Sequence, residues 1–214
     1  MPNLIPAILA SDEETFRERL KLVEKNFPLI QIDVMDGKFV PNKTWFDAEA
    51  WQELETPAEF ELHLMVLNPP YYIEGTQEIK KIVRYLWHVE AKTNHLALIG
   101  NCHDLHKQAG LAISPKTPVD QLAPYADLID EILVMGAEPG ASGQKLQPES
   151  IERVREIHKR WPNLPIGFDI NVNAQTIPEL KAAGVSRFCS ASAIFNAKNP
   201  LKAATGLVNI LGGK

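Results

Sequence analysis

The feature that most constrains the fold of this chain is an eightfold alternation of short apolar runs with amphipathic stretches. The apolar runs have the length of buried strands and lie at residues 4–9, 29–34, 59–65, 81–87, 110–114, 128–135, 165–170 and 186–192. The helical patterns between them cover residues 12–26, 45–54, 69–79, 93–108, 118–124, 147–161, 174–183 and 199–211. No linker or low-complexity tract interrupts the series.

Eight strand–helix units predict an α/β protein that folds as one (β/α)8 TIM barrel, a single domain over residues 1–214. A doubly wound open sheet is the competing architecture, but no glycine-rich dinucleotide loop follows the first strand. In such barrels, the carboxyl ends of the strands and the loops after them carry the chemistry. Candidate functional residues are therefore those at the strand ends.

The composition narrows the classes of partner. A net charge of −5 does not provide the basic surface that nucleic acid requires. No apolar run approaches the roughly 20 residues of a membrane span, and the start of the chain lacks the pattern of a secretory signal. Cys102 and Cys189, at no metal-like spacing, are typical of free thiols in a reducing compartment, so we expect a cytoplasmic protein without nucleic acid or membrane partners.

Polar side chains gather at three predicted strand ends. Strand alternation places Gln31 and Asp33 on one face of the second strand, while His63 and Asp169 lie near the ends of the third and seventh strands. Taken singly, each is more simply a structural or core residue. Together at one barrel mouth, two carboxylates, an imidazole and an amide suit a hard or borderline divalent metal. Two carboxylates from opposite sides also suit proton removal from one face of a carbon and delivery to the other.

Motifs at these strand ends resemble the ribulose-phosphate 3-epimerase family in order and spacing, over essentially the whole chain. The matching strings are DVMDGKFVPN (33–42), HLMVLNPPYYIE (63–74), HVEA (88–91), LVMGAEPGASGQKL (133–146) and SAIF (192–195). The resemblance implies an isomerase of the pentose phosphate pathway that interconverts ribulose 5-phosphate and xylulose 5-phosphate. It further implies an enediolate held on a divalent metal and a homo-oligomeric assembly.

The resemblance also assigns roles to residues at the mouth. It makes Asp33 and Asp169 the acid/base pair, and it places the family's His, Asp, His and Asp metal ligands on Gln31, Asp33, His63 and Asp169. An amide oxygen is a weaker and harder donor than an imidazole nitrogen, and it shifts preference from Zn or Fe toward Mn or Mg. The cofactor is therefore expected to be one of these four cations.

The implied substrate-binding positions are Ala7, Met35, His63, Met65, Met135, Gly140, Gly143, Asn171 and Ser192. The three methionines match those that shield the family's intermediate, whereas Ala7 replaces a serine. On the phosphate side, the family's Asp-Gly-Gly is Asp169-Ile170-Asn171, and its Gly-Ser is Ala191-Ser192. Because glycines let backbone N–H groups approach an oxyanion closely, Ile170 is a steric and conformational obstacle.

Three functions stay open on these grounds. One of them, a barrel kept mainly as an assembly unit, rests on the family's habit of forming homo-oligomers. The retained aspartates and methionines favour an epimerase. The five substitutions favour a divergent member, either an enzyme for another sugar phosphate or a non-catalytic binding protein. Lys38 adds a cation near the mouth that could compensate for metal charge or bind a phosphate, although a solvated loop lysine is the commoner case.

Other residues have predictions of their own. Trp45, Trp51 and Trp161 fit either an oligomer interface or core packing. His88 is expected to be structural, and four histidines are expected on the surface of helices: His95, His103, His106 and His158.

Overall fold

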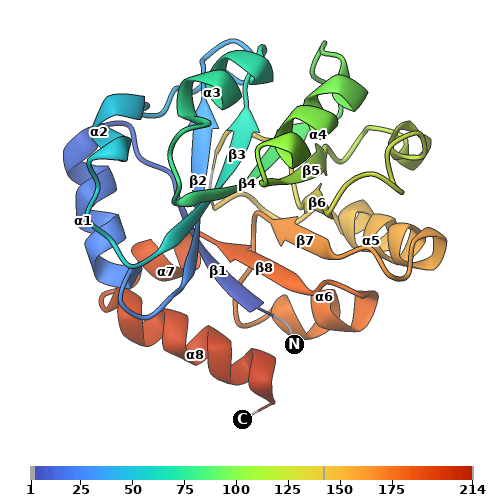
Figure 1. Ribbon diagram of the computed structural model, residues 1–214. Coiled ribbons are helices and arrows are strands. Elements are labelled where there is room, and N and C mark those ends of the chain that lie inside the picture. The colour runs from blue at the N-terminus through green and yellow to red at the C-terminus, as the bar shows by residue number, and fades with distance from the viewer. Residues whose placement is uncertain (1–2, 142, 214) are drawn as a thin grey trace.

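The computed structural model describes residues 3–141 and 143–213, which form a closed barrel of eight parallel strands in chain order (Figure 1). The strands are β1 (Asn3–Ile8), β2 (Leu29–Met35), β3 (Glu59–Met65), β4 (Ile82–His88), β5 (Gln108–Ile113), β6 (Glu131–Met135), β7 (Ile166–Asp169) and β8 (Arg187–Ser190). The predicted (β/α)8 barrel is confirmed.

Helices surround the barrel (Figure 1). They are α1 (Glu13–Val23), α2 (Ala48–Gln52), α3 (Pro69–Thr76), α4 (His95–Asp104), α5 (Pro148–Arg160), α6 (Ile177–Ala183), α7 (Ser192–Phe195) and α8 (Pro200–Gly212), with the 3₁₀ turn η1 at Val119–Leu122. Side-chain caps define several starts. For example, the Asp12 carboxylate accepts the backbone N–H of Thr15 at 2.8 Å before α1.

Several predicted bounds differ from the structure; for example, the helix predicted at 93–108 is α4, which ends at Asp104, so His106 lies after it. Two further differences concern short helices. Residues 118–124 form only the short turn η1, because Pro124 has no N–H with which to continue a helix. The last strand ends at Ser190, and Ser192 begins the unpredicted helix α7, whose first turn closes on the Ala191 carbonyl.

Two predictions for aromatic side chains are resolved by burial. Trp51 is buried and stacks on Phe16, so core packing explains it. The prediction of a surface position for His95 is wrong, because this ring is buried and accepts a hydrogen bond from the Trp87 indole at 3.0 Å.

Strand alternation divides the barrel residues into two sets. Apolar side chains such as Ile30, Ile32 and Val34 of β2 point outward into the main core beneath the helices. The side chains between them point inward and form the interior of the barrel. Gln31 and Asp33 belong to this inward set, as the sequence indicates.

The amino-terminal end of the interior holds a buried charged cluster. Glu61 pairs with Arg84 at 2.5 Å and Arg187 at 2.6 Å, and Glu131 pairs with Arg187 at 2.6 Å. Above it lies an apolar layer that includes Ala7. The inward-facing polar groups at the carboxyl end of the barrel are therefore the ones that can line a pocket. Within the described residues, no helix is long and apolar enough to cross a membrane.

Candidate active site

A pocket opens at the carboxyl end of the barrel. Eight of the residues singled out in the sequence line it: Asp33, Met65, Met135, Gly140, Gly143, Asp169, Asn171 and Ser192. The substituted positions Ile170 and Ala191 also line it, together with Cys189. The strand ends and loops that the sequence indicates therefore meet at one place.

Four expected site residues lie beneath this lining or beside it. Gln31 and His63 are fully buried at the floor, in contact with Asp33. Ala7 lies in the apolar layer, and Met35 packs in a small cluster with Val40 and Met65. Neither Ala7 nor Met35 lines the pocket in the part of the chain that the structure describes.

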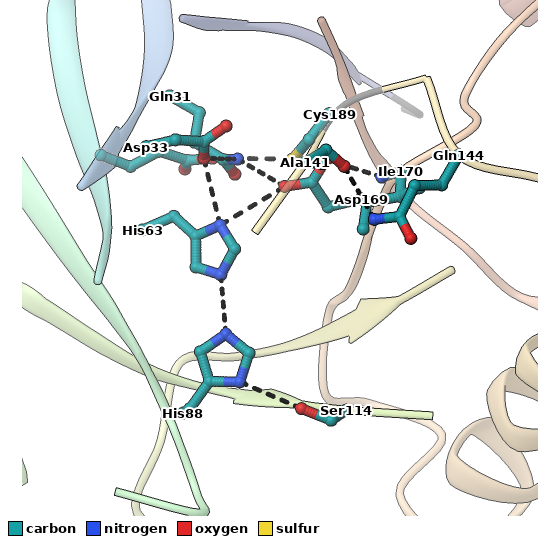
Figure 2. Close-up of polar contacts among 11 residues, drawn as sticks. Gln31, Asp33, His63, His88, Ser114, Ala141, Gln144, Asp169, Ile170 and Cys189 are labelled. Carbon is teal, nitrogen blue, oxygen red and sulfur yellow. Dashed lines mark hydrogen bonds and ion pairs between the residues drawn. The ribbon is translucent and has the colours of Figure 1, made fainter. Parts of the chain in front are cut away.

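The two aspartates meet around the Gln31 amide and the His63 ring (Figure 2). The Nε2 of Gln31 donates to Asp33 Oδ1 and to Asp169 Oδ2, each at 2.8 Å. The Nδ1 of His63 lies 3.1 Å from Asp33 Oδ1 and 3.4 Å from Asp169 Oδ2. Strands β2, β3 and β7 thus bring four polar groups to one point.

This crowding shifts the acid–base equilibria of the floor. Burial raises the pKa of Asp33, and the negative charge of Asp169 raises it further. Burial alone would lower the pKa of His63, but hydrogen bonds to Asp169 and Asp33 and their charges raise it to about 9. Without a cation, the imidazolium of His63 therefore partly neutralises the two carboxylates.

The donor set fits a divalent cation. Ligand atoms of Asp33, His63 and Asp169 all lie within 4.8 Å of one another, and all three residues are buried. Among the residues that the structure describes, the buried Gln31 Oε1 has no hydrogen-bond partner. A half-turn of the amide would exchange Nε2 for this oxygen and offer a fourth ligand, so the chemistry of the set matches a cation bound mainly by oxygen.

Two further residues connect to this floor from β4 and the loop after it, and sequence reasoning missed the connection. His88 Nε2 lies 3.1 Å from His63 Nε2, and His88 Nδ1 lies 3.3 Å from Glu90 Oε2. Strand alternation gives the signal that could have found His88, since inward-facing Arg84 and Leu86 precede it at a spacing of two.

The loop after β7 departs from ordinary backbone geometry. Ile170 has φ of 73° and Asn171 has φ of 60°, the left-handed region that glycine adopts readily. The Ile170 N–H donates to Asp169 Oδ1 at 2.6 Å, which holds that carboxylate. The side chain of Asn171 links the loop after β7 to the loop after β6, because its Nδ2 donates to the Gln144 carbonyl at 2.7 Å.

Lys38 does not line the mouth in the described part of the chain. Its side chain is exposed and borders a separate surface hollow with Asp36 and Tyr71. Its backbone N–H donates to the Asp36 carboxylate at 2.8 Å, in a turn that this aspartate organises. The geometry thus gives no support to a role for Lys38 in compensating metal charge or binding a phosphate at the mouth.

Fold and site together define the class of this protein as a (β/α)8-barrel enzyme with paired carboxylates at its carboxyl face. Residues 3–195 match the sequence model of the ribulose-phosphate 3 epimerase family. The chain belongs to this family, whose named members are enzymes of the isomerase class.

Individual relatives agree with this assignment. The chain is similar to ribulose-phosphate 3-epimerase of Schizosaccharomyces pombe, with 30% identity over 97% of this chain and 92% of that protein. It is also similar to the cytoplasmic isoform of this enzyme from Oryza sativa subsp. japonica, with 33% identity over 92% of this chain and 89% of that protein. Among solved structures, KGPDC from Streptococcus mutans superposes with a TM-score of 0.75 over 99% and 98% of the two chains, at 12% identity. That last likeness shows the fold alone.

Proposed function

We propose that this protein interconverts ribulose 5-phosphate and xylulose 5-phosphate, with Asp33 and Asp169 as the two acid/base groups. The observation that carries the proposal is the meeting of both carboxylates at the pocket floor, where they share the Gln31 amide and the His63 ring. They reach this point from β2 and β7 and both line the pocket. A sugar carbon above the floor would thus have a carboxylate on either side.

The electrostatics of the pair support proton exchange. Burial and the charge of Asp169 raise the pKa of Asp33, which makes this carboxylate a better proton acceptor than an exposed aspartate. One group can then accept a proton from the substrate carbon while the other donates to the opposite face. Reversal of the roles carries the reaction the other way.

A divalent cation, when bound, would supply positive charge that stabilises the negative charge developing on the substrate oxygens. Asp33, His63 and Asp169 would hold it, with the Gln31 amide oxygen as a further ligand. Because oxygen atoms would then outnumber nitrogen atoms among the protein ligands, we propose Mn²⁺ or Mg²⁺ rather than Zn²⁺ or Fe²⁺. Met65 and Met135 would exclude water from the reacting carbon, since both line the pocket.

The direct test is conversion of ribulose 5-phosphate by purified protein before and after chelation, with Mn²⁺, Mg²⁺ or Zn²⁺ added back. We expect turnover that needs a cation and that falls by at least ~10²-fold in Asp33→Asn and in Asp169→Asn. Asp127→Asn, which alters an exposed carboxylate, is the matched control and should keep full activity. Full turnover in either site variant would contradict the proposal.

One observation favours a second candidate function, action on a different sugar phosphate or binding without catalysis. Ile170 puts a β-branched side chain on the pocket wall where the resemblance implies a glycine. Calorimetric titration with ribulose 5-phosphate separates these alternatives. Tight binding without turnover would support a binding protein, and no binding would support another substrate.

We further propose a cytoplasmic homo-oligomer. Cys102 and Cys189 are buried free thiols, which suits a reducing compartment. The oligomeric assembly rests on the family resemblance, and light scattering of the purified protein tests it. A monomer at micromolar concentration would contradict this part of the proposal.

A further inference from the structure

We propose that Glu90 and His88 are positioning residues that fix the ring protons of His63 and leave its Nδ1 free for a cation. The binding of a cation by Nδ1 rests on the proposed function. The positions of the ring protons on His88 and His63 do not depend on that function. The inference is drawn from a continuous line of contacts that runs from the pocket floor to the loops after β4 and β5. Figure 2 shows the two imidazole rings joined nitrogen to nitrogen, with Ser114 on the far side of His88.

The line begins at a firmly held carboxylate. Glu90 Oε1 accepts the Ser114 backbone N–H at 2.8 Å and the Thr117 hydroxyl. Burial by itself would raise the pKa of Glu90, but its hydrogen bonds from His88, Thr117 and Ser114 lower it to about 2. An ionised carboxylate has lone pairs and no proton, so Glu90 can only accept from its neighbours.

Because Glu90 can only accept, it determines which nitrogen of His88 carries a proton. His88 Nδ1 lies 3.3 Å from Glu90 Oε2 and therefore carries the proton of that contact. A neutral imidazole carries one ring proton, and the contact with Glu90 places it on Nδ1. With Nδ1 protonated, His88 Nε2 has a lone pair and must accept.

The proton position on His88 in turn determines the one on His63. The two Nε2 atoms lie 3.1 Å apart, so one must donate and the other must accept. Since His88 accepts, His63 donates from Nε2, and its remaining nitrogen is the Nδ1 that faces Asp33 and Asp169. When a cation replaces the Nδ1 proton, His63 thus presents an Nδ1 lone pair beside Asp33 and Asp169.

Packing keeps the second ring in place. The Phe39 ring lies against His88 with centroids 4.9 Å apart, and the His63 and His88 rings are nearly parallel at 5.3 Å. Both imidazoles are fully buried. Rotation of His88 would break contacts on three sides, so its Nδ1 stays toward Glu90 and its Nε2 toward His63.

The test is ¹⁵N NMR of ring-labelled histidine in the metal-free protein and with Zn²⁺, a diamagnetic probe. We expect His88 as the neutral Nδ1–H form in both samples, and His63 as the Nε2–H form with Nδ1 bound in the zinc sample. The variants Glu90→Gln and His88→Gln should shift the remaining signals and weaken zinc binding by about 10–100-fold, the usual effect of removing an outer partner of a metal-bound histidine.

The control is His103→Gln, which alters an exposed histidine that also pairs with a carboxylate, Asp130, at 3.0 Å. It should change neither the site signals nor zinc affinity. If His88→Gln fails to fold, Glu90→Gln carries the test.

The proposal is overturned by an Nε2–H or doubly protonated His88 in the native protein, or by unchanged zinc affinity in a folded Glu90→Gln variant. The expected His88 form without zinc binding would instead support the order of protons and refute the proposed cation site.

Discussion

At the scale of single residues, the loop after β7 has a left-handed backbone conformation that suits glycine, but its residue there is Ile170. Ile170 has φ of 73°, and a β-branched residue in this region is uncommon. The left-handed conformation costs roughly 1–2 kcal/mol for a residue with a Cβ. The Ile170 N–H that holds Asp169 depends on this conformation, so the strain is tied to the position of a proposed catalytic group.

The strain can be measured by comparing two variants. Ile170→Ala and Ile170→Gly both remove the buried side chain, but only glycine relieves the unfavourable φ. We expect the Gly variant to be more stable than the Ala variant by about 1 kcal/mol in urea unfolding. At Ile132, a buried strand residue, the order should be reversed, because glycine in an ordinary strand is less stable than alanine by roughly 0.5–1 kcal/mol. The same order at both positions would contradict the account.

Gln31 gives a second prediction at this scale. Gln31→His would place an imidazole beside Asp33 and Asp169, where the amide now lies. Because Zn²⁺ prefers nitrogen donors more strongly than Mn²⁺ does, we expect zinc affinity to rise at least ~10-fold relative to manganese affinity. Competition with a chromophoric chelator measures both constants. An unchanged ratio would mean that residue 31 does not contact the cation.

At the scale of elements, the site depends on how β6 and β7 end. Gly136 follows β6, and its N–H donates to the Asp169 carbonyl at 2.7 Å. A Cβ at Gly136 would lie 2.6 Å from the Ile170 carbonyl oxygen and 3.0 Å from that of Asp169. Such contacts are with backbone atoms, which cannot rotate away.

We therefore expect Gly136→Ala to push the end of β7 outward and to displace Asp169. Turnover should fall by at least ~10-fold, since a displacement of about 1 Å can cost 10²-fold. Gly206→Ala on α8 is the control, because a Cβ there meets no atom of the described residues within 4 Å. Equal activity in the two variants would show that the β6–β7 junction does not set the site.

The elements also show what the sequence can and cannot predict. Periodicity located the eight strands, because inward and outward faces of a barrel strand differ in polarity. The convergence of Gln31, Asp33, His63 and Asp169 followed from topology once eight strands were counted. The contact of His88 with His63 did not follow, because a histidine at a strand end has the same pattern whether it packs or positions a neighbour. The helix predicted at residues 118–124 is only the shorter 3₁₀ turn η1, and helix α7 was missed because short helices carry little periodicity.

At the scale of the whole molecule, the barrel places a charged cluster at one end and the site at the other. Glu131 is fully buried in this cluster. Burial, together with the charge of Glu61, raises its pKa to about 7 against the opposing effect of Arg187 and Arg84. The folded chain therefore holds this proton more tightly than the unfolded chain does.

The free energy of unfolding should therefore fall as pH rises. Stability from protonated Glu131 is fully present below the ordinary pKa of 4.5 and is lost as pH rises through about 7. The loss is on the order of 3 kcal/mol at most, at 1.36 kcal/mol per pKa unit. Urea unfolding from pH 5 to pH 8 should show this decline in the native protein and not in Glu131→Gln. Parallel curves for the two proteins would contradict the raised pKa.

The measurement that tests the central claim most directly is the exchange of hydrogen at the substrate carbon during turnover in D₂O. The protein is loaded with Mn²⁺ for the reaction, and the cation is removed by chelation before the product is examined by NMR. If Asp33 and Asp169 act on opposite faces, xylulose 5-phosphate formed from ribulose 5-phosphate will carry solvent deuterium at the inverted carbon. Asp33→Asn and Asp169→Asn will each lose conversion by at least ~10²-fold. Product formed without deuterium, or at the native rate in either variant, would contradict the two-carboxylate account.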